Sequence, residues 1–300
     1  MSIALMFPGQ GAQYIGMGQS LCEKNCRAKE IFSRAEKVLG PQFLQICFHG
    51  PDEVLVQTSI CQPALFVHGC AVTNILREMG YNFDVAYGLS LGELTALWAA
   101  EVIDFETGIH MVSERGRLMQ AACEKTKGSM LCLLGGSLED VDSVCHESGV
   151  EVANMNCPGQ IVVSGETKNI EKAKALAEKM AFKRVLQLNV AGAYHSRLME
   201  SASVGFEKVL QNIEFHPPRI KVLTNVTGEC VKSPGEIKEM LVRQIVSPIL
   251  FEKCCRSAMR MQISEFFECG PKKTLCGILK KIDKDIIAKS FDSMEDFNCQ

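Results

Sequence analysis

The sequence predicts an α/β fold in which a small subdomain is inserted into a larger one. Short apolar strands alternate with helices along most of the chain, and a Gly-x-Ser-x-Gly turn joins a strand to a helix at residues 88–92. A compact βαββαβ unit interrupts this alternation from about residue 125. The 300 residues suit one large domain with an insertion, or two domains, better than one small core.

Hydrophobic periodicity and chain breakers define the elements that precede the inserted unit. Two short apolar strands are expected at residues 3–7 and 84–88. Between the first strand and the first helix, Gln10 lies in a loop between two glycines, at the end of a strand where open α/β sheets bind ligands. Four helices, several of them ended by glycine or proline, are expected at residues 20–39, 59–79, 91–102 and 105–122.

The Gly-x-Ser-x-Gly turn is the strongest local signal. A serine between two glycines, after a strand and before a helix, is typical of a nucleophile elbow. Such a tight turn leaves little room for a Cβ at Gly88 or Gly92. The N–H of Leu91, at the helix start, would point toward an oxyanion formed at Ser90. The alternative is an ordinary glycine-rich turn with an unreactive serine.

The segment that follows residue 125 forms a unit of its own. Its strands and helices are expected, in chain order, at residues 129–134, 137–147, 150–154, 160–164, 167–180 and 183–188. This βαββαβ order fits a ferredoxin-like fold. We therefore expect a ferredoxin-like small subdomain over residues 125–198, inserted in an α/β-hydrolase-like large subdomain over residues 1–124 and 199–300.

The remaining residues return to alternating helices and strands and complete the parent sheet. Helices are expected at residues 200–211, 234–245, 251–261 and 274–281. Strands are expected at residues 220–225 and 263–268. The last dozen residues give no clear pattern.

Composition excludes several classes of function. The net charge of -3 and the scattered Lys and Arg residues argue against a nucleic-acid partner. We expect no membrane partner and no signal peptide, because no uninterrupted apolar run could cross a bilayer and the amino terminus lacks a basic leader. The 15 cysteines are irregularly spaced, without a Cys-x-x-Cys pair, so Cys70, Cys132 and Cys276 are expected to fill the core. Free thiols indicate a reducing compartment, either the cytosol or an organelle matrix, and of these we expect a cytoplasmic protein.

The positions of two further side chains make them candidates for a functional site. Arg115 falls near the apolar stripe of its predicted helix, whereas a helical arginine is usually found on the solvated face. His195, one of 6 histidines, lies in a loop of small residues at the junction of the predicted subdomains. A loop histidine is more often a surface residue than a catalytic base, so both interpretations stay open.

Together these motifs resemble the malonyl-CoA:acyl carrier protein transacylases, a family that also supplies acyltransferase domains of fatty-acid and polyketide synthases. The resemblance runs nearly end to end. The matching segments are residues 7–13, 62–64, 88–93, 115–116, 156–165 and 192–196, followed by Gln244, Glu268 and residues 270–271. Several motifs in one order are far more specific than any single motif.

The resemblance implies an acyltransferase with a catalytic dyad that has no acidic third member. Ser90 would be the nucleophile and His195 the base, and a malonyl-serine intermediate would split the transfer into two steps. A backbone carbonyl, here that of Gln244, would orient the histidine ring. The N–H groups of Gln10 and Leu91 would hold the oxyanion.

The same resemblance implies which residues bind the substrate. Arg115 would hold the planar malonyl carboxylate in a two-pronged hydrogen bond and so separate malonyl from acetyl groups. Gln62, Asn156 and Tyr194 would also bind substrate, and the bulk of Tyr194 would disfavour methylmalonyl. Leu89 departs from the histidine that is common in the family and removes a polar neighbour of the serine.

The implied partners are malonyl-CoA and an acyl carrier protein, whose phosphopantetheine thiol receives the malonyl group for fatty acid biosynthesis. No cofactor and no metal are implied, and we expect a monomer. A basic stretch at residues 272–284 could meet the acidic carrier protein, although a solvated helix face explains it better.

Three alternatives remain open from the sequence. A polyketide synthase could use the same acyltransferase, and a serine hydrolase or thioesterase could share the elbow. A scaffold without catalysis could also bind the carrier protein. The combination of Ser90, His195, Arg115 and Gln10 favours transfer.

Overall fold

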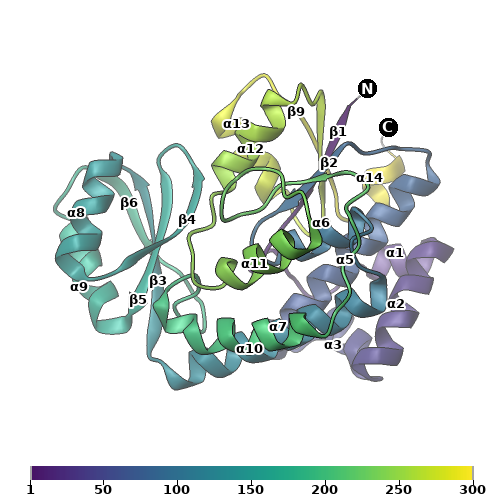
Figure 1. Cartoon of the computed structure of the whole chain (residues 1–300), viewed down its shortest axis with the longest axis horizontal. Helices are drawn as coiled ribbons and strands as arrows, with labels where there is room; N and C mark the ends of the chain where they lie inside the picture. The colour runs from purple at the N-terminus through teal and green to yellow at the C-terminus, as the bar shows by residue number, and fades with distance from the viewer. Residues whose placement is uncertain (1, 299–300) are drawn as a thin grey trace.

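The computed structural model describes residues 2–298, which fold into two subdomains that lie side by side (Figure 1). The amino-terminal part of the large subdomain comprises β1 (Ile3–Phe7), α1 (Gln19–Lys24), α2 (Cys26–Leu39), α3 (Phe43–His49), α4 (Asp52–Leu55), α5 (Thr58–Glu78), β2 (Val85–Gly88), α6 (Leu91–Ala99) and α7 (Phe105–Lys125). The small subdomain, at the left of Figure 1, comprises β3 (Gly128–Gly135), α8 (Leu138–Ser148), β4 (Glu151–Cys157), β5 (Gln160–Glu166), α9 (Thr167–Ala177) and β6 (Phe182–Gln187). The chain then returns to the large subdomain through η1 (Arg197–Met199), α10 (Glu200–Gln211), β7 (Lys221–Val222), α11 (Pro234–Gln244), α12 (Phe251–Arg260), β8 (Glu265–Cys269), α13 (Thr274–Ile282), β9 (Ile287–Phe291) and α14 (Met294–Asn298).

A parallel sheet of five strands forms the centre of the large subdomain. Its order is β7-β2-β1-β8-β9, and every neighbouring pair is parallel. Alternate residues of β1 enter different cores: Leu5 and Phe7 pack with α5 and α6, whereas Ala4 and Met6 pack with α12 and α13. Because helices cover both faces, all of β1 is buried, which explains why this strand is an unbroken apolar run.

The small subdomain is a four-stranded antiparallel sheet in the order β4-β5-β3-β6. α8 and α9 cover one face, where Leu131 and Leu133 pack with apolar side chains of both helices. On the other face, Met130 and Cys132 join the main core of the large subdomain. This strand order is that of a ferredoxin-like sheet, and the predicted α/β fold with a small inserted subdomain is confirmed.

The structure differs from the sequence prediction at several elements. Asn25 divides the helix expected at residues 20–39, because it leaves the helical conformation and its side chain accepts a hydrogen bond from the N–H of Ala28 as the N-cap of α2. The short helices α3 and α4 were not predicted, and neither were β9 and α14, which lie in a stretch with no clear pattern. β9 pairs with β8 at the sheet edge, so long-range pairing determines its structure rather than local sequence.

The sequence prediction concerned uninterrupted apolar runs, and one helix with polar interruptions still has the length and mean composition to cross a bilayer. α5 is long and apolar enough to do so, because an average over a window tolerates interruptions such as His68. However, 83% of that window is buried inside the protein, where α5 packs against α2, α6 and α7. α5 is therefore a core helix, and among the residues described it is the one helix that meets this criterion.

The two glycines of the elbow allow α6 to start directly against the sheet. A Cβ added to Gly88 would lie 2.2 Å from the carbonyl carbon of Gly92, and one added to Gly92 would lie 2.0 Å from the carbonyl oxygen of Phe7. Both contacts are with backbone, which cannot move away as a flexible side chain can. The prediction that neither position has room for a side chain is confirmed.

Gly92→Ala is therefore expected to lower the free energy of unfolding by at least about 1–3 kcal/mol, because the new methyl group would push α6 away from β1. Chemical denaturation monitored by circular dichroism measures this change. Gly277→Ala is the matched control, because nothing lies within 4 Å of a Cβ at this helical glycine. If Gly92→Ala were as stable as Gly277→Ala, the proposed packing constraint would be wrong.

Candidate active site

Ser90 lies between β2 and α6 in a conformation that few residues adopt, with φ 55° and ψ -100°. The side chain of Asn225 holds the backbone on both sides of it. Asn225 Oδ1 accepts a hydrogen bond from the N–H of Ser90 at 2.7 Å, and Asn225 Nδ2 donates to the carbonyl oxygen of Gly88 at 2.7 Å. A strained backbone conformation persists only where surrounding contacts hold it in place, and the two hydrogen bonds from Asn225 do so here.

His195 contacts the serine from the loop between β6 and η1. Its Nε2 lies 2.9 Å from Ser90 Oγ, and its Nδ1 lies 2.8 Å from the backbone oxygen of Gln244, the last residue of α11. Because a carbonyl only accepts, Nδ1 carries the proton and Nε2 is free to accept the serine proton. The ring is only 4% exposed, so the alternative of a surface histidine is wrong.

Arg115 approaches the same serine from α7. Its guanidinium donates to Ser90 Oγ at 3.0 Å, to Gln62 Oε1 at 2.8 Å and to Gln244 Oε1 at 2.8 Å. The side chain is completely buried, as its position near the apolar stripe of the helix suggested. Burial lowers the pKa of Arg115 to about 10, while the nearby carboxylate of Glu93 opposes the shift, so the group remains charged at neutral pH.

Burial also explains the protonation state of the histidine. Removal from water, together with the positive charge of Arg115, lowers the pKa of His195 to about 3, although the hydrogen bond to Gln244 acts in the opposite direction. His195 is therefore neutral at physiological pH, which is the form that can accept a proton.

The two backbone amides expected to face an oxyanion belong to residues that line the same cavity as the serine. Leu91 is the first residue of α6, and Gln10 lies in the loop after β1. Among the hydrogen bonds of residues 2–298, neither backbone N–H has a partner. Both residues also line the cavity that contains Ser90, so both donors are available to a ligand there.

That cavity has a volume of about 110 Å³ and brings most of the predicted site residues together. Its lining comprises Gln10, Gln62, Leu89, Ser90, Leu91, Arg115, Met119, Met130, Asn154, Leu188, Val190, Tyr194 and His195. Tyr194 is fixed there, since its hydroxyl lies 2.5 Å from Thr58 Oγ1 and 3.5 Å from Gln10 Nε2. Asn156 is absent from the lining and Asn154, two residues earlier on β4, is present.

Two residues of the site were assigned no role from the sequence. Glu93 is buried beneath the serine, and its Oε2 accepts from the backbone N–H of Asn225 at 2.8 Å and from Gln244 Nε2 at 2.7 Å. Glu93 belongs to the elbow motif and could have been singled out as an acidic residue in an apolar helix. Asn225 follows a short strand and gives no local signal. No group of three potential metal ligands occurs within the described part of the chain.

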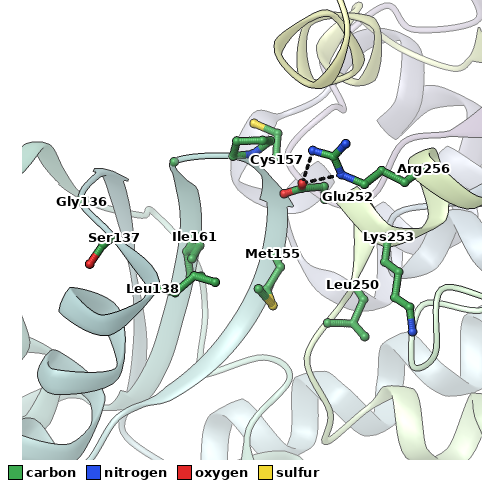
Figure 2. Close-up of a pocket in the computed structure, with 12 residues that line it drawn as sticks. Gly136, Ser137, Leu138, Met155, Cys157, Ile161, Leu250, Glu252, Lys253 and Arg256 are labelled. Carbon is green, nitrogen blue, oxygen red and sulfur yellow. Dashed lines mark hydrogen bonds and ion pairs between the residues drawn. The ribbon is translucent and has the colours of Figure 1, made fainter.

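A second and larger cavity, of about 460 Å³, lies between the β4–β5 hairpin and α12 (Figure 2). Met155 and Ile161 face it from the small subdomain, and α12 contributes an ion pair between Arg256 and Glu252. None of the predicted site residues lines this cavity. A backbone hydrogen bond from Met155 to Ile249 joins the two subdomains beside it.

Comparison with known proteins agrees with this geometry. Residues 5–289 match the model of the acyl transferase domain family. The chain belongs to this acyltransferase family. A malonyl CoA-acyl carrier protein transacylase of Bacillus subtilis (strain 168) is 37% identical over 287 residues, which cover 94% of this chain and 90% of that protein.

Solved structures extend the likeness to the complete fold. The crystal structure of an acyl carrier protein S-malonyltransferase from Vibrio cholerae has a TM-score of 0.96 at 34% identity and covers 100% of this chain and 99% of that one. A malonyl-transacylase in complex with a type II PKS acyl-carrier protein has a TM-score of 0.96 at 32% identity, covering 99% and 98%. The resemblance to the malonyl-CoA:acyl carrier protein transacylases is confirmed. The predictions that this chain is an enzyme and that it has this fold are confirmed with it.

The low pKa of His195 predicts an unusual pH dependence for this acyltransferase. The rate constant for acylation of Ser90 should stay constant as the pH falls from about 7 to about 5, because the folded histidine remains neutral whereas a free one is protonated near pH 6.5. Between these two pKa values the unfolded chain binds the extra proton, so stability should fall as the pH falls below about 6.5. Rapid-quench kinetics and thermal unfolding measure the two effects, and a loss of rate with a midpoint near pH 6.5 would contradict the assignment.

Proposed function

We propose that this acyltransferase transfers a malonyl group from coenzyme A to the phosphopantetheine thiol of an acyl carrier protein through an ester on Ser90. The observation that carries the proposal is the convergence of His195 and Arg115 on one serine oxygen, at 2.9 and 3.0 Å. A base and a fixed positive charge at a single hydroxyl suit a nucleophile that acts on an anionic acyl group.

In the first step, Ser90 Oγ attacks the thioester carbon of malonyl-CoA while His195 Nε2 accepts the hydroxyl proton. The carbonyl oxygen becomes an oxyanion, which the N–H groups of Gln10 and Leu91 stabilise. The carbon–sulfur bond then breaks, and the imidazolium returns its proton to the departing CoA thiolate. The products are free CoA and a malonyl ester on Ser90.

The second step is the same chemistry with a different thiol. The phosphopantetheine thiol gives its proton to His195 and its sulfur attacks the ester carbon. The carbon–oxygen bond of the ester breaks, and Ser90 recovers the proton from the imidazolium. No acidic third member is needed, because the backbone oxygen of Gln244 holds Nδ1 of the ring at 2.8 Å.

Arg115 supplies the selectivity for malonyl. Its guanidinium lies within hydrogen-bond distance of the oxygen that becomes the ester, so a carboxylate two carbons further along the acyl group is within its reach. An acetyl group offers no counter-charge to this buried cation, at a cost of about 3–5 kcal/mol. The cavity of about 110 Å³ is small, which suits a short acyl group.

Three further residues are proposed to contact the substrate, and two of them line the cavity. Gln62 and Tyr194 line the cavity, and Gln62 fixes the guanidinium at 2.8 Å. The large ring of Tyr194 leads us to expect that methylmalonyl is disfavoured. The role of Asn156 stays a prediction without support from its position, since Asn154 lines the cavity in its place.

We place the reaction in fatty acid biosynthesis, in the cytoplasm, with the protein acting as a monomer. The relatives named as malonyl CoA-acyl carrier protein transacylases support malonyl-CoA and the carrier protein as partners. The 14 cysteines of the described residues are free thiols, and Cys70, Cys132 and Cys276 are buried as predicted, which suits a reducing compartment. The match to a malonyl-transacylase bound to a type II PKS carrier protein keeps a polyketide pathway as the second candidate.

Ser90→Ala is expected to abolish transfer and also the covalent intermediate, because no other hydroxyl in the cavity has a base beside it. Brief incubation with malonyl-CoA followed by intact-protein mass spectrometry should show one added malonyl group on the wild type and none on the variant. Ser143→Ala, at a position on α8 where the serine bonds only the backbone, should behave as the wild type. A malonyl adduct that persists on Ser90→Ala would assign the nucleophile to another residue.

Arg115→Ala is expected to reduce the preference for malonyl-CoA over acetyl-CoA by a factor of roughly 10² to 4 × 10³, the equivalent of about 3–5 kcal/mol. Competition between the two thioesters for Ser90 measures the preference. Arg117→Ala is the control on the same helix, because its side chain is 59% exposed and pairs with Glu114. Equal discrimination by both variants would remove the role assigned to Arg115.

A further inference from the structure

The reaction described above makes no use of Glu93, although this buried carboxylate binds Gln244 and Asn225, which both contact Ser90. The side chain of Glu93 lies in the first turn of α6 and is only 2% exposed. Burial raises the pKa of Glu93 above its usual range, and hydrogen bonds from Asn225 and Gln244 and the charge of Arg115 oppose this shift only in part. A carboxyl group kept in this position at the cost of desolvation needs a physical reason.

Glu93 determines which way the side-chain amide of Gln244 faces. Gln244 Nε2 donates to Glu93 Oε2 at 2.7 Å and to the backbone oxygen of Ser90 at 3.0 Å, while Gln244 Oε1 accepts from Arg115 at 2.8 Å. A carboxylate only accepts and a guanidinium only donates. Rotating the amide by half a turn would oppose oxygen to oxygen and nitrogen to nitrogen, so the two charged groups together permit one orientation.

The orientation matters because Gln244 is bound to the reacting groups from both its side chain and its backbone. The backbone oxygen of Gln244 accepts from Nδ1 of His195, and the side chain holds the guanidinium of Arg115. A change in the side chain therefore reaches the base and the cation together. Ser90 is tied to the same unit through its backbone oxygen.

Glu93 also supports the hydrogen bonds that hold the backbone of the strained serine in place. Its Oε2 accepts from the backbone N–H of Asn225, whose side chain holds the N–H of Ser90 and the carbonyl oxygen of Gly88. The same carboxylate oxygen thus fixes both Asn225 and Gln244. It also compensates the buried charge of Arg115 through Gln244, since Glu93 is the carboxylate whose charge acts on that guanidinium.

We propose that Glu93 is a positioning residue of the transfer reaction, whose buried carboxylate fixes Gln244 and Asn225 and thereby aligns His195 and Arg115 around Ser90. This proposal rests on the proposed function for the identity of the reacting groups. Glu93 touches neither the substrate nor the reacting atoms, and it acts only through its neighbours.

Glu93→Gln tests the proposal, because it keeps the shape of the side chain and removes the charge that orients Gln244. The single-turnover rate constant for malonylation of Ser90 at saturating malonyl-CoA should fall at least about tenfold, since small misplacements of catalytic groups have large effects on rate. The concentration of malonyl-CoA that gives half the maximal rate should change little. A fluorophosphonate probe, which reacts with an activated serine whatever the acyl donor, should label the variant more slowly by a similar factor.

Glu268→Gln is the matched control. Glu268 is equally buried, and its two oxygens accept from the N–H groups of Leu275 and Cys276 at 3.0 and 2.8 Å, at the start of α13 and away from the dyad. This control should lower the melting temperature and leave both rate constants per folded molecule unchanged. A purely structural role for Glu93 predicts the same result for Glu93→Gln.

The outcomes separate this proposal from the proposed function. If wild-type protein is malonylated and Glu93→Gln reacts at the wild-type rate in both assays, the positioning role is overturned and the transferase function stands. If the wild type reacts with the fluorophosphonate but not with malonyl-CoA, the proposed function fails, and the ratio of labelling rates alone decides the role of Glu93. Should Glu93→Gln not fold, Glu93→Asp, which keeps the charge but withdraws it by one methylene, takes its place, and wild-type rates in that variant overturn the proposal.

Discussion

A positive charge buried beside the serine is the constraint from which the rest of the site follows. A guanidinium removed from water needs acceptors on its N–H groups and a negative charge within reach. Gln62, Gln244 and Ser90 supply the acceptors, and Glu93 supplies the charge through Gln244. Burial and this cation together keep the neighbouring histidine neutral, and we propose that the same cation creates the preference for an anionic acyl group.

The arrangement of the two subdomains brings these groups together. α7 carries Arg115 and leads directly into β3, while the loop that leaves the small subdomain carries His195. α11 adds Gln244, and the strand–turn–helix of the parent sheet adds the serine. In Figure 1, α7 and α10 run along the lower side of the molecule, and α12 and α13 of the larger subdomain contact β4 of the inserted sheet. The cavity at Ser90 therefore has walls from both subdomains.

Local patterns predicted most of the fold, and each miss has a physical cause of its own. Long apolar runs with glycine breaks defined β1, α5 and the βαββαβ order because both faces or one clear stripe of each element is buried. β9 was missed because its burial pattern is weak and its pairing with β8 is a long-range contact. The break at Asn25 was missed because a capping side chain interrupts an otherwise continuous helical pattern.

The sequence by itself determined the fold class and the family resemblance, and it singled out the serine, histidine and arginine that meet in one cavity, because steric limits at the elbow and several ordered motifs leave few alternatives. Only the tertiary structure decided that His195 is buried rather than on the surface, that Asn154 rather than Asn156 faces the cavity, and that Glu93 and Asn225 belong to the site. Burial and hydrogen-bond direction depend on segments more than 100 residues apart, such as Glu93 and Asn225, separated by 132 positions. No local pattern carries that information, since it arises only when the sheet, α11 and the inserted subdomain close around the same oxygen atom.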